Sequence, residues 1–213
     1  MIQTSIGFKS KGHSLEGVLT LPRDASSKIQ ALIVSHPHPV IGGNMDNPVV
    51  KAICQTADEH GLATLRFNFR GVGNSEGEFS NGIGEREDLK AALNVLKHWP
   101  EMRGVSISLI GYSFGAGVIL SGLRKCKEAR SLVLVAPPIS SVRNSYIKSD
   151  KRPKLFLVGQ QDRICPSQEL QGVLDGVRQP LQFSEIPCAD HGLSSHENEV
   201  ASRVVEFVVG ALN

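Results

Sequence analysis

The sequence predicts an α/β fold, in which a mostly parallel sheet is covered by helices on both faces. Runs rich in valine, isoleucine and leucine alternate with segments of helical periodicity from about residue 29 onward. Such alternation builds parallel sheets, whose strands are buried on both faces. The 213 residues contain no internal repeat, low-complexity tract or linker, so we expect residues 1–213 to form one domain.

The apolar runs place the strands. Six of them alternate with helices, and two strand-like segments precede them and are able to pair as an antiparallel edge. The two early segments are Ile2–Phe8 and Leu15–Leu21, and the later strands are Ile29–Ser35, Leu62–Phe69, Val105–Ile110, Ser131–Ala136, Lys154–Gly159 and Leu181–Ile186.

Two helices have the clearest periodicity. The segment from Glu85 to Trp99 has one apolar stripe at helical spacing, made of Leu89, Ala92, Leu93 and Leu96. The last helix is expected over Glu197–Leu212. Ser194 followed by Glu197 has the pattern of a capping box, which predicts the start of that helix.

The bulk composition argues against several classes of function. Hydrophobic residues make up 40% of the chain, charged residues make up 21%, and the net charge of +2 is spread without a basic block. This composition is typical of a soluble globular protein and favours neither nucleic acid nor a membrane surface as partner. The first residues lack the apolar core of a signal peptide, so we expect a cytoplasmic protein. The cysteines, without metal-finger or Cys-x-x-Cys spacing, are expected to be reduced structural thiols: Cys54, Cys126, Cys165 and Cys188.

The strongest signal for function is the segment Gly111-Tyr112-Ser113-Phe114-Gly115, between an expected strand and a helix-like segment. A serine at the tip of so tight a turn is held in strained backbone geometry, so its hydroxyl projects clear of the sheet. Glycines two positions to either side remove the Cβ atoms that would collide there. The following helix points its N-terminus at the site, which favours negative charge. We therefore expect Ser113 to be a nucleophile.

A serine nucleophile needs a general base and an acid that orients the base. On such a turn both partners follow the serine in the chain, the acid first. Only two of the seven histidines come after Ser113: His191 follows the last strand, whereas His196 begins the last helix, so His191 is the expected base. The acid is chosen among Asp150, Asp162, Asp175 and Asp190. Asp162 is expected because it lies just beyond the carboxyl end of a strand, where such sheets bind ligands.

Two backbone N–H groups are expected to form an oxyanion hole. One belongs to Phe114, the residue after the nucleophile, and the other to the loop after the first parallel strand. That loop reads His36-Pro37-His38-Pro39-Val40-Ile41-Gly42-Gly43. Proline has no N–H, so His38, between two prolines, is the expected second donor.

These residues resemble the small, lidless α/β-hydrolases of bacteria, which are related more distantly to dienelactone hydrolases. The matching pieces occur in order over most of the chain: His36-Pro37-His38-Pro39 with Gly42-Gly43, Arg66 to Gly73 with Ser75 and Gly77, Gly82 to Glu85, the segment around Ser113, Gly159 to Asp162, and Asp190-His191-Gly192. The resemblance implies an eight-stranded sheet whose second strand is antiparallel. Dienelactone hydrolases carry a cysteine where this chain has Ser113, so lactone hydrolysis is not implied.

The spacing of the later strands predicts that the site is open. Larger members of the superfamily insert a cap after the strand that is Ser131–Ala136 here, but only Pro137 to Pro153 precede the next strand. We expect a loop or short helix and no cap domain. That segment is largely polar and only 5% of the chain is aromatic, so a long acyl chain would find little apolar cover. The expected activity is that of a carboxylesterase on small esters with acyl groups of about two to six carbons, without a cofactor or metal.

Other interpretations fit parts of the sequence. The same three side chains would serve a thioesterase, an amidase or a peptidase. A non-catalytic scaffold that binds a small molecule or a partner protein would be expected to lack one of them. A zinc site would combine His36 and His38 with Asp162 or His191, but no further ligand cluster accompanies them. The sequence allows an oligomer without predicting one.

Overall fold

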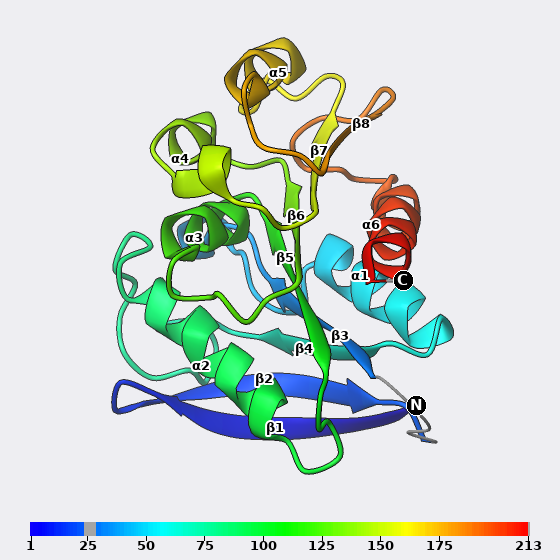
Figure 1. Ribbon diagram of the computed structural model, residues 1–213. Coiled ribbons are helices and arrows are strands. Elements are labelled where there is room, and N and C mark those ends of the chain that lie inside the picture. The colour runs from blue at the N-terminus through cyan, green and yellow to red at the C-terminus, as the bar shows by residue number, and fades with distance from the viewer. Residues whose placement is uncertain (24–28, 213) are drawn as a thin grey trace.

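The computed structural model, which describes residues 1–23 and 29–212, contains an eight-stranded sheet with helices on both sides (Figure 1). The strand order is β1-β2-β4-β3-β5-β6-β7-β8. The strands are β1 (Ile2–Ser10), β2 (His13–Leu21), β3 (Gln30–Ser35), β4 (Ala63–Phe67), β5 (Ser106–Tyr112), β6 (Ser131–Val135), β7 (Lys154–Gly159) and β8 (Leu181–Ile186). Each begins and ends close to its predicted bounds, and the apolar runs of the central strands β3 to β7 are largely buried in the sheet.

Among the described strands, β2 is the one that runs antiparallel to its neighbours. It pairs with β1 on one side and β4 on the other, and the remaining pairs are parallel. A two-residue turn joins β1 to β2, and both of its residues have positive φ angles, 48° at Lys11 and 95° at Gly12. Such a turn matches the twist of the strands and sets their register, in which Ser10 faces His13. The predicted eight-stranded sheet with an antiparallel second strand is confirmed.

Helices cover both faces of the sheet. They are α1 (Pro48–Glu59), α2 (Glu85–His98), α3 (Phe114–Gly122), α4 (Ile139–Arg143), α5 (Ser167–Leu174) and α6 (Glu197–Leu212), with the 3₁₀ helices η1 (Pro39–Ile41) and η2 (Tyr146–Ser149). α1 and α6 pack together over one face, and α2 and α3 lie over the other (Figure 1). Successive residues of a strand point to opposite faces. Leu32 and Val34 therefore join the core under α1 and α6, whereas Ile33 joins the core under α2 and α3.

Helix α6 has its predicted bounds, but the turn that precedes it differs from the expectation. The helix begins at Glu197, but Leu193 and Ser195 before it have positive φ angles of 56° and 66°. The N–H of His196 donates to the carbonyl oxygen of Leu193 at 3.1 Å. Ser194 therefore lies inside a turn that precedes the helix, and the predicted capping box is wrong.

Helix α1 lies between β3 and β4, where a helix was expected without bounds, and its start carries a sequence signal. The side chain of Asn47 accepts a hydrogen bond from the N–H of Val49 at 3.0 Å, and Pro48 occupies the first helical position. An asparagine cap followed by proline is a common helix start. The helix brings Val50 and Ile53 onto the core that it shares with α6.

The segment between β6 and β7 forms no lid. It folds into α4 and η2, and these pack against α3 and α5. The carboxyl edge of the sheet is left without a cap, as predicted. Within residues 1–23 and 29–212, no helix combines the length and the apolar character that crossing a membrane would require.

Candidate active site

Ser113 lies at the tip of the turn between β5 and α3, with φ of 51° and ψ of −110°. Positive φ is a strained conformation for a residue with a side chain. The N–H of Ser113 donates to the carbonyl oxygen of Val135 at 2.8 Å and so anchors the turn to β6. A Cβ atom on Gly111 would lie 2.5 Å from the backbone of α3, and one on Gly115 would lie 2.4 Å from the carbonyl oxygen of Ser35. Both glycines are therefore required for the close packing that presents the serine hydroxyl at the carboxyl edge.

Three predicted side chains form one hydrogen-bonded chain at this edge. The Oγ of Ser113 lies 3.0 Å from Nε2 of His191, and Nδ1 of His191 lies 2.8 Å from Oδ2 of Asp162. The carboxylate of Asp162 is buried, and its Oδ1 accepts the N–H groups of Ile164 and Cys165 at 2.8 and 2.7 Å. A carboxylate that accepts in this way places the imidazole proton on Nδ1. Nε2 is then free to accept the proton of the Ser113 hydroxyl.

Contacts between the loops after β7 and β8 hold this chain together. A Cβ atom on Gly159 would lie 2.4 Å from the carbonyl oxygen of Ala189, so the loops approach closely only because glycine stands there. The N–H of Gln161 donates to the same carbonyl at 2.8 Å. The hydroxyl of Tyr112, beside the serine, donates to the carbonyl oxygen of His191 at 2.7 Å. Burial, together with the charge of nearby Asp162, raises the pKa of Tyr112, so it remains a protonated donor.

The loop after β3 brings His38, one of the two predicted oxyanion donors, next to Phe114, the other. His38 lies immediately before η1, and its ring centroid is 5.2 Å from that of Phe114. Phe114 is the first residue of α3, where an N–H has no partner within the helix. Among the described residues, the N–H of His38 likewise donates to no backbone or side-chain group. Two unpaired amide donors therefore lie on neighbouring residues beside Ser113.

His36 fixes this loop, a role that we had not predicted. Its ring is buried; Nδ1 donates to the carbonyl oxygen of Pro37 at 2.7 Å, and Nε2 accepts the N–H of Phe69 at 3.1 Å. Burial lowers the pKa of His36 to about 4, so the ring stays neutral. His36 thereby connects the start of the loop that carries His38 to the segment that follows β4. The histidine at the end of an apolar strand was the sequence signal for this contact.

The geometry favours neither a metal centre nor a thiol nucleophile. Both ring nitrogens of His36 are taken by the backbone, and no group of three or more potential ligands gathers within the described ranges. Cys165 is buried beside Asp162, and burial raises the pKa of its thiol to about 12. A thiol with so high a pKa is not a nucleophile at neutral pH.

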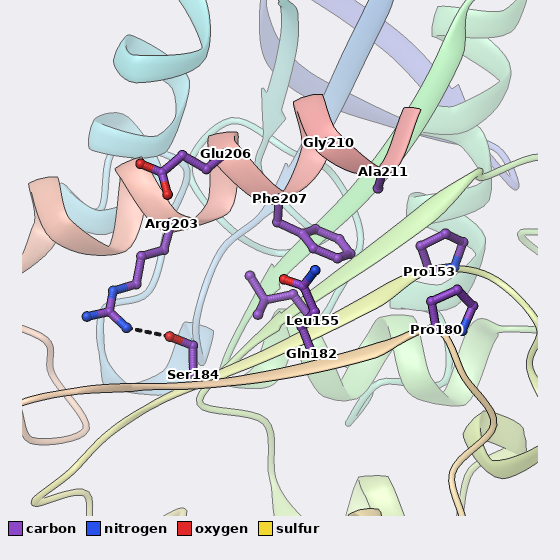
Figure 2. A pocket seen from close by; sticks show the side chains of 10 residues that line it. All are labelled: Pro153, Leu155, Pro180, Gln182, Ser184, Arg203, Glu206, Phe207, Gly210 and Ala211. Carbon is purple, nitrogen blue, oxygen red and sulfur yellow. Dashed lines mark hydrogen bonds between the residues drawn. The ribbon is translucent and has the colours of Figure 1, made fainter. Parts of the chain in front are cut away.

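A hollow of about 720 Å³ lies away from these residues, between the beginnings of β7 and β8 and the last turns of α6 (Figure 2). Pro153 and Pro180 lie at one end of it, and Arg203, hydrogen-bonded to Ser184, lies at the other (Figure 2). None of the predicted site residues lines it. It occupies the amino-terminal end of its strands, opposite the edge where Ser113 lies.

The fold and the three-residue chain define an α/β hydrolase. The Dienelactone hydrolase family is matched over residues 81–206, and the chain belongs to this family. The match includes the segment around Ser113, the loop of Asp162 and the loop of His191.

Solved structures of similar proteins share the whole fold. An α/β serine hydrolase homologue from Coxiella burnetii is 32% identical, with 97% of both chains covered and a TM-score of 0.82. A serine hydrolase without a lid from Xanthomonas campestris is 27% identical over 98% of this chain and 94% of that one, with a TM-score of 0.84. A protein of unknown function from Agrobacterium tumefaciens is 27% identical over 99% and 97%, with a TM-score of 0.87.

Proposed function

We propose that this protein is a serine hydrolase that cleaves small carboxylic esters through an acyl-enzyme on Ser113. The observation that carries the proposal is the hydrogen-bonded chain from Ser113 through His191 to Asp162, with distances of 3.0 and 2.8 Å. Membership of the Dienelactone hydrolase family and the identity with the Coxiella serine hydrolase homologue support the same reaction class.

In the acylation step, Oγ of Ser113 attacks the ester carbonyl carbon while its proton passes to Nε2 of His191. The carbonyl oxygen becomes an oxyanion, and the N–H groups of Phe114 and His38 stabilise it. The buried carboxylate of Asp162 stabilises the imidazolium that forms. The tetrahedral intermediate then expels the alcohol, whose oxygen takes the proton from Nε2.

In the deacylation step, water replaces the alcohol. Nε2 of His191 removes a proton from the water as its oxygen attacks the acyl carbon, and the same amides hold the second oxyanion. Collapse of this intermediate breaks the bond to Oγ of Ser113 and returns the proton to the serine. The products are one carboxylic acid and one alcohol per turnover.

An ester is the favoured substrate because of the leaving group. An alcohol departs readily once Nε2 donates its proton, whereas an amine must be protonated before it leaves and needs closer positioning. The open edge supplies no lid that would position a peptide. The thiol of a thioester leaves as easily as the alcohol of an ester and uses the same catalytic groups, so a thioesterase is the second candidate. A non-catalytic scaffold would not need the intact Ser113–His191–Asp162 chain.

The test is hydrolysis by the purified protein of p-nitrophenyl acetate, an acetyl thioester and an acetyl amide, compared with the Ser113→Ala variant. We expect the ester to turn over and the variant to lose about 10⁴- to 10⁶-fold in kcat. Ser121→Ala makes the same chemical change at an exposed position of α3 and is the matched control. No turnover of any substrate, or equal rates in wild type and Ser113→Ala, would overturn the proposal.

A further inference from the structure

Exposed apolar side chains gather at the carboxyl edge of the sheet. Within the described residues, six large ones are more than half exposed: Ile2 (55%), Val40 (71%), Ile41 (81%), Ile83 (67%), Tyr146 (54%) and Ile164 (67%). Four of the six lie on loops that follow β3, β4 and β7, which are the loops that surround Ser113. A single exposed isoleucine needs no explanation, but a group of them around one site points to a ligand.

An aromatic wall adjoins these side chains. The rings of His38, Phe79 and Phe114 contact one another, with centroid distances of 5.2 Å from His38 to each phenylalanine and 5.5 Å between the phenylalanines. All three rings are only partly buried. Because His38 and Phe114 also carry the proposed oxyanion donors, the wall lies beside the carbonyl group that would react.

The loop that carries Phe79 and Ile83 is held in place by buried carboxylates. Glu85 accepts hydrogen bonds from the N–H and the hydroxyl of Ser80 at 2.8 and 2.9 Å. Asp88 binds the guanidinium of Arg70 through two contacts of 2.6 and 3.0 Å. Glu85 and Asp88 are both fully buried. The apolar surface is therefore preformed, and binding need not order it.

The strand order decides which part of an ester can reach this surface. β5, which carries Ser113, has β3 and β4 on one side and β6, β7 and β8 on the other. His191 follows β8 and must donate a proton to the leaving oxygen, so the alcohol lies on that side. Val40, Ile41, Phe79 and Ile83 follow β3 and β4, on the opposite side. The acyl group leaves the carbonyl carbon in a direction different from that of the alcohol, and the side of these four residues, which we call the apolar rim, is open to it.

We propose that the apolar rim (Val40, Ile41, Phe79 and Ile83) binds the hydrocarbon part of the acyl group, so that the preferred substrates are esters of unbranched or aryl acids near six carbons. This inference rests on the proposed esterase function and deepens it. The rim contacts a chain from one side, since no lid covers the other. Each methylene is therefore expected to gain about half of the free energy of full burial, so that kcat/KM rises about twofold per methylene where full burial would give about fourfold. The rise is expected to flatten beyond about six carbons.

The test compares kcat/KM for p-nitrophenyl acetate, butyrate, hexanoate and octanoate. In wild type the hexanoate-to-acetate ratio is expected to be about 16, from four methylenes at about twofold each. Ile41→Ser and Ile83→Ser are expected to lower that ratio to about 4 or less, and the double variant to about 1 to 2, by the same reasoning. All are exposed positions, so folding is not threatened.

Two controls make the same substitution elsewhere. Ile164→Ser changes an isoleucine as exposed as Ile83, at 67%, but on the β7 loop outside the rim. It is expected to keep the wild-type ratio, and only the ratio is compared, because the N–H of Ile164 donates to Asp162. Ile2→Ser changes an exposed residue of the edge strand β1 and is expected to leave all rates unchanged. Thermal unfolding of each variant checks the fold.

Each outcome separates the rim from the esterase proposal. Hydrolysis that depends on Ser113 but keeps its chain-length ratio in the Ile41→Ser, Ile83→Ser and double variants overturns the rim alone. The absence of Ser113-dependent hydrolysis in wild type overturns both proposals. Sedimentation equilibrium is measured in parallel, and a wild-type dimer that Ile41→Ser converts to monomer without a change in the ratio would assign the rim to a second copy and overturn its role in substrate binding.

Discussion

The two ends of the sheet differ in shape and in chemistry. At the amino-terminal ends of β7 and β8 lies the hollow of about 720 Å³, where Arg203 is hydrogen-bonded to Ser184 (Figure 2). Arg203 also binds Glu199 of α6. At the carboxyl edge the surface is open, yet Ser113 and His191 lie 3.0 Å apart there. Parallel strands bring their following loops together at one edge only. In this molecule the candidate site lies where the loops converge and not at the hollow of about 720 Å³.

The largest effect in this comparison is expected from Asp162→Asn. Oδ1 of Asp162 accepts two backbone N–H groups, so an asparagine would keep its oxygen there and turn its amide nitrogen toward Nδ1 of His191. Nδ1 would then have to accept a hydrogen bond from that amide, so the ring proton would sit on Nε2. A protonated Nε2 could no longer accept the hydrogen bond from Ser113. We expect kcat for p-nitrophenyl acetate to fall by about 10⁴-fold with the fold preserved. Asp190→Asn, beside the histidine, is the matched control, and a nearly wild-type Asp162→Asn would show that another group orients His191.

A smaller effect is expected from His36→Gln, which removes the ring that joins Pro37 to Phe69. The substitution leaves the Ser113–His191–Asp162 chain intact but loosens the loop that carries the His38 donor. Because the loss of one oxyanion donor costs about 10²- to 10³-fold, a displaced donor is expected to lower kcat by about 10- to 100-fold with little change in KM. Steady-state kinetics with p-nitrophenyl acetate, whose acyl group is too short to reach far along the apolar rim, check this. A loss that appears wholly as a rise in KM would contradict the donor role of the loop.

The same variant has a pH signature in stability. Burial lowers the pKa of His36 from 6.5 to about 4, so below pH 6.5 the unfolded chain binds a proton that the folded protein does not. The stability is therefore complete above pH 6.5 and is lost as the pH falls toward 4. Between pH 7 and 5 the contribution of His36 to stability is expected to fall by about 2 kcal/mol, and this contribution is absent in His36→Gln.

Urea unfolding of both proteins at pH 7 and pH 5 measures this difference. Burial also raises the pKa of Asp58 to about 6, and this carboxyl contributes in the opposite direction over the same range. Asp58 is present in both proteins, so the wild type must be compared with His36→Gln and not judged alone. Parallel pH curves for the two proteins would contradict the buried, neutral His36.

The smallest effect is expected at the other end of the sheet. Gly210 lines the hollow near the end of α6, and a Cβ atom there would meet nothing within 4 Å. Gly210→Ala is expected to stabilise the protein by about 0.5 kcal/mol through helix propensity and to leave kcat/KM unchanged. Thermal unfolding and ester kinetics check both parts. A loss of activity would show that the hollow is coupled to the site and would contradict the independence of the two ends of the sheet.

The parts of the molecule that local sequence determines were predicted well. Strands such as Lys154–Gly159 are continuous apolar runs, and a run of this kind buried on both faces needs no tertiary information to recognise. The segment around Ser113 carries its own turn geometry in two glycines. Chain order then selected Asp162 and His191, and the structure brings all three side chains together.

The parts that depend on distant contacts were missed. The Ser194–Glu197 pattern predicted a cap, but a turn with positive φ at Leu193 and Ser195 precedes the helix instead. His36 was recognised as part of a motif, yet its role depends on the N–H of Phe69, 33 residues away in the chain. The exposed side chains of Val40, Ile41 and Ile83 come from loops about 40 residues apart in the chain, whereas the sequence-based prediction rested only on the polar segment 137–153 and the low aromatic content.

The central claim is that Ser113 is the nucleophile, and a fluorophosphonate probe tests it most directly. Such a probe phosphonylates a serine only when a neighbouring base activates the hydroxyl. We expect a single adduct, located by mass spectrometry of the digested protein on the peptide that contains Ser113. We expect no adduct in Ser113→Ala. An adduct on another residue, or labelling of Ser113→Ala at the wild-type rate, would contradict it.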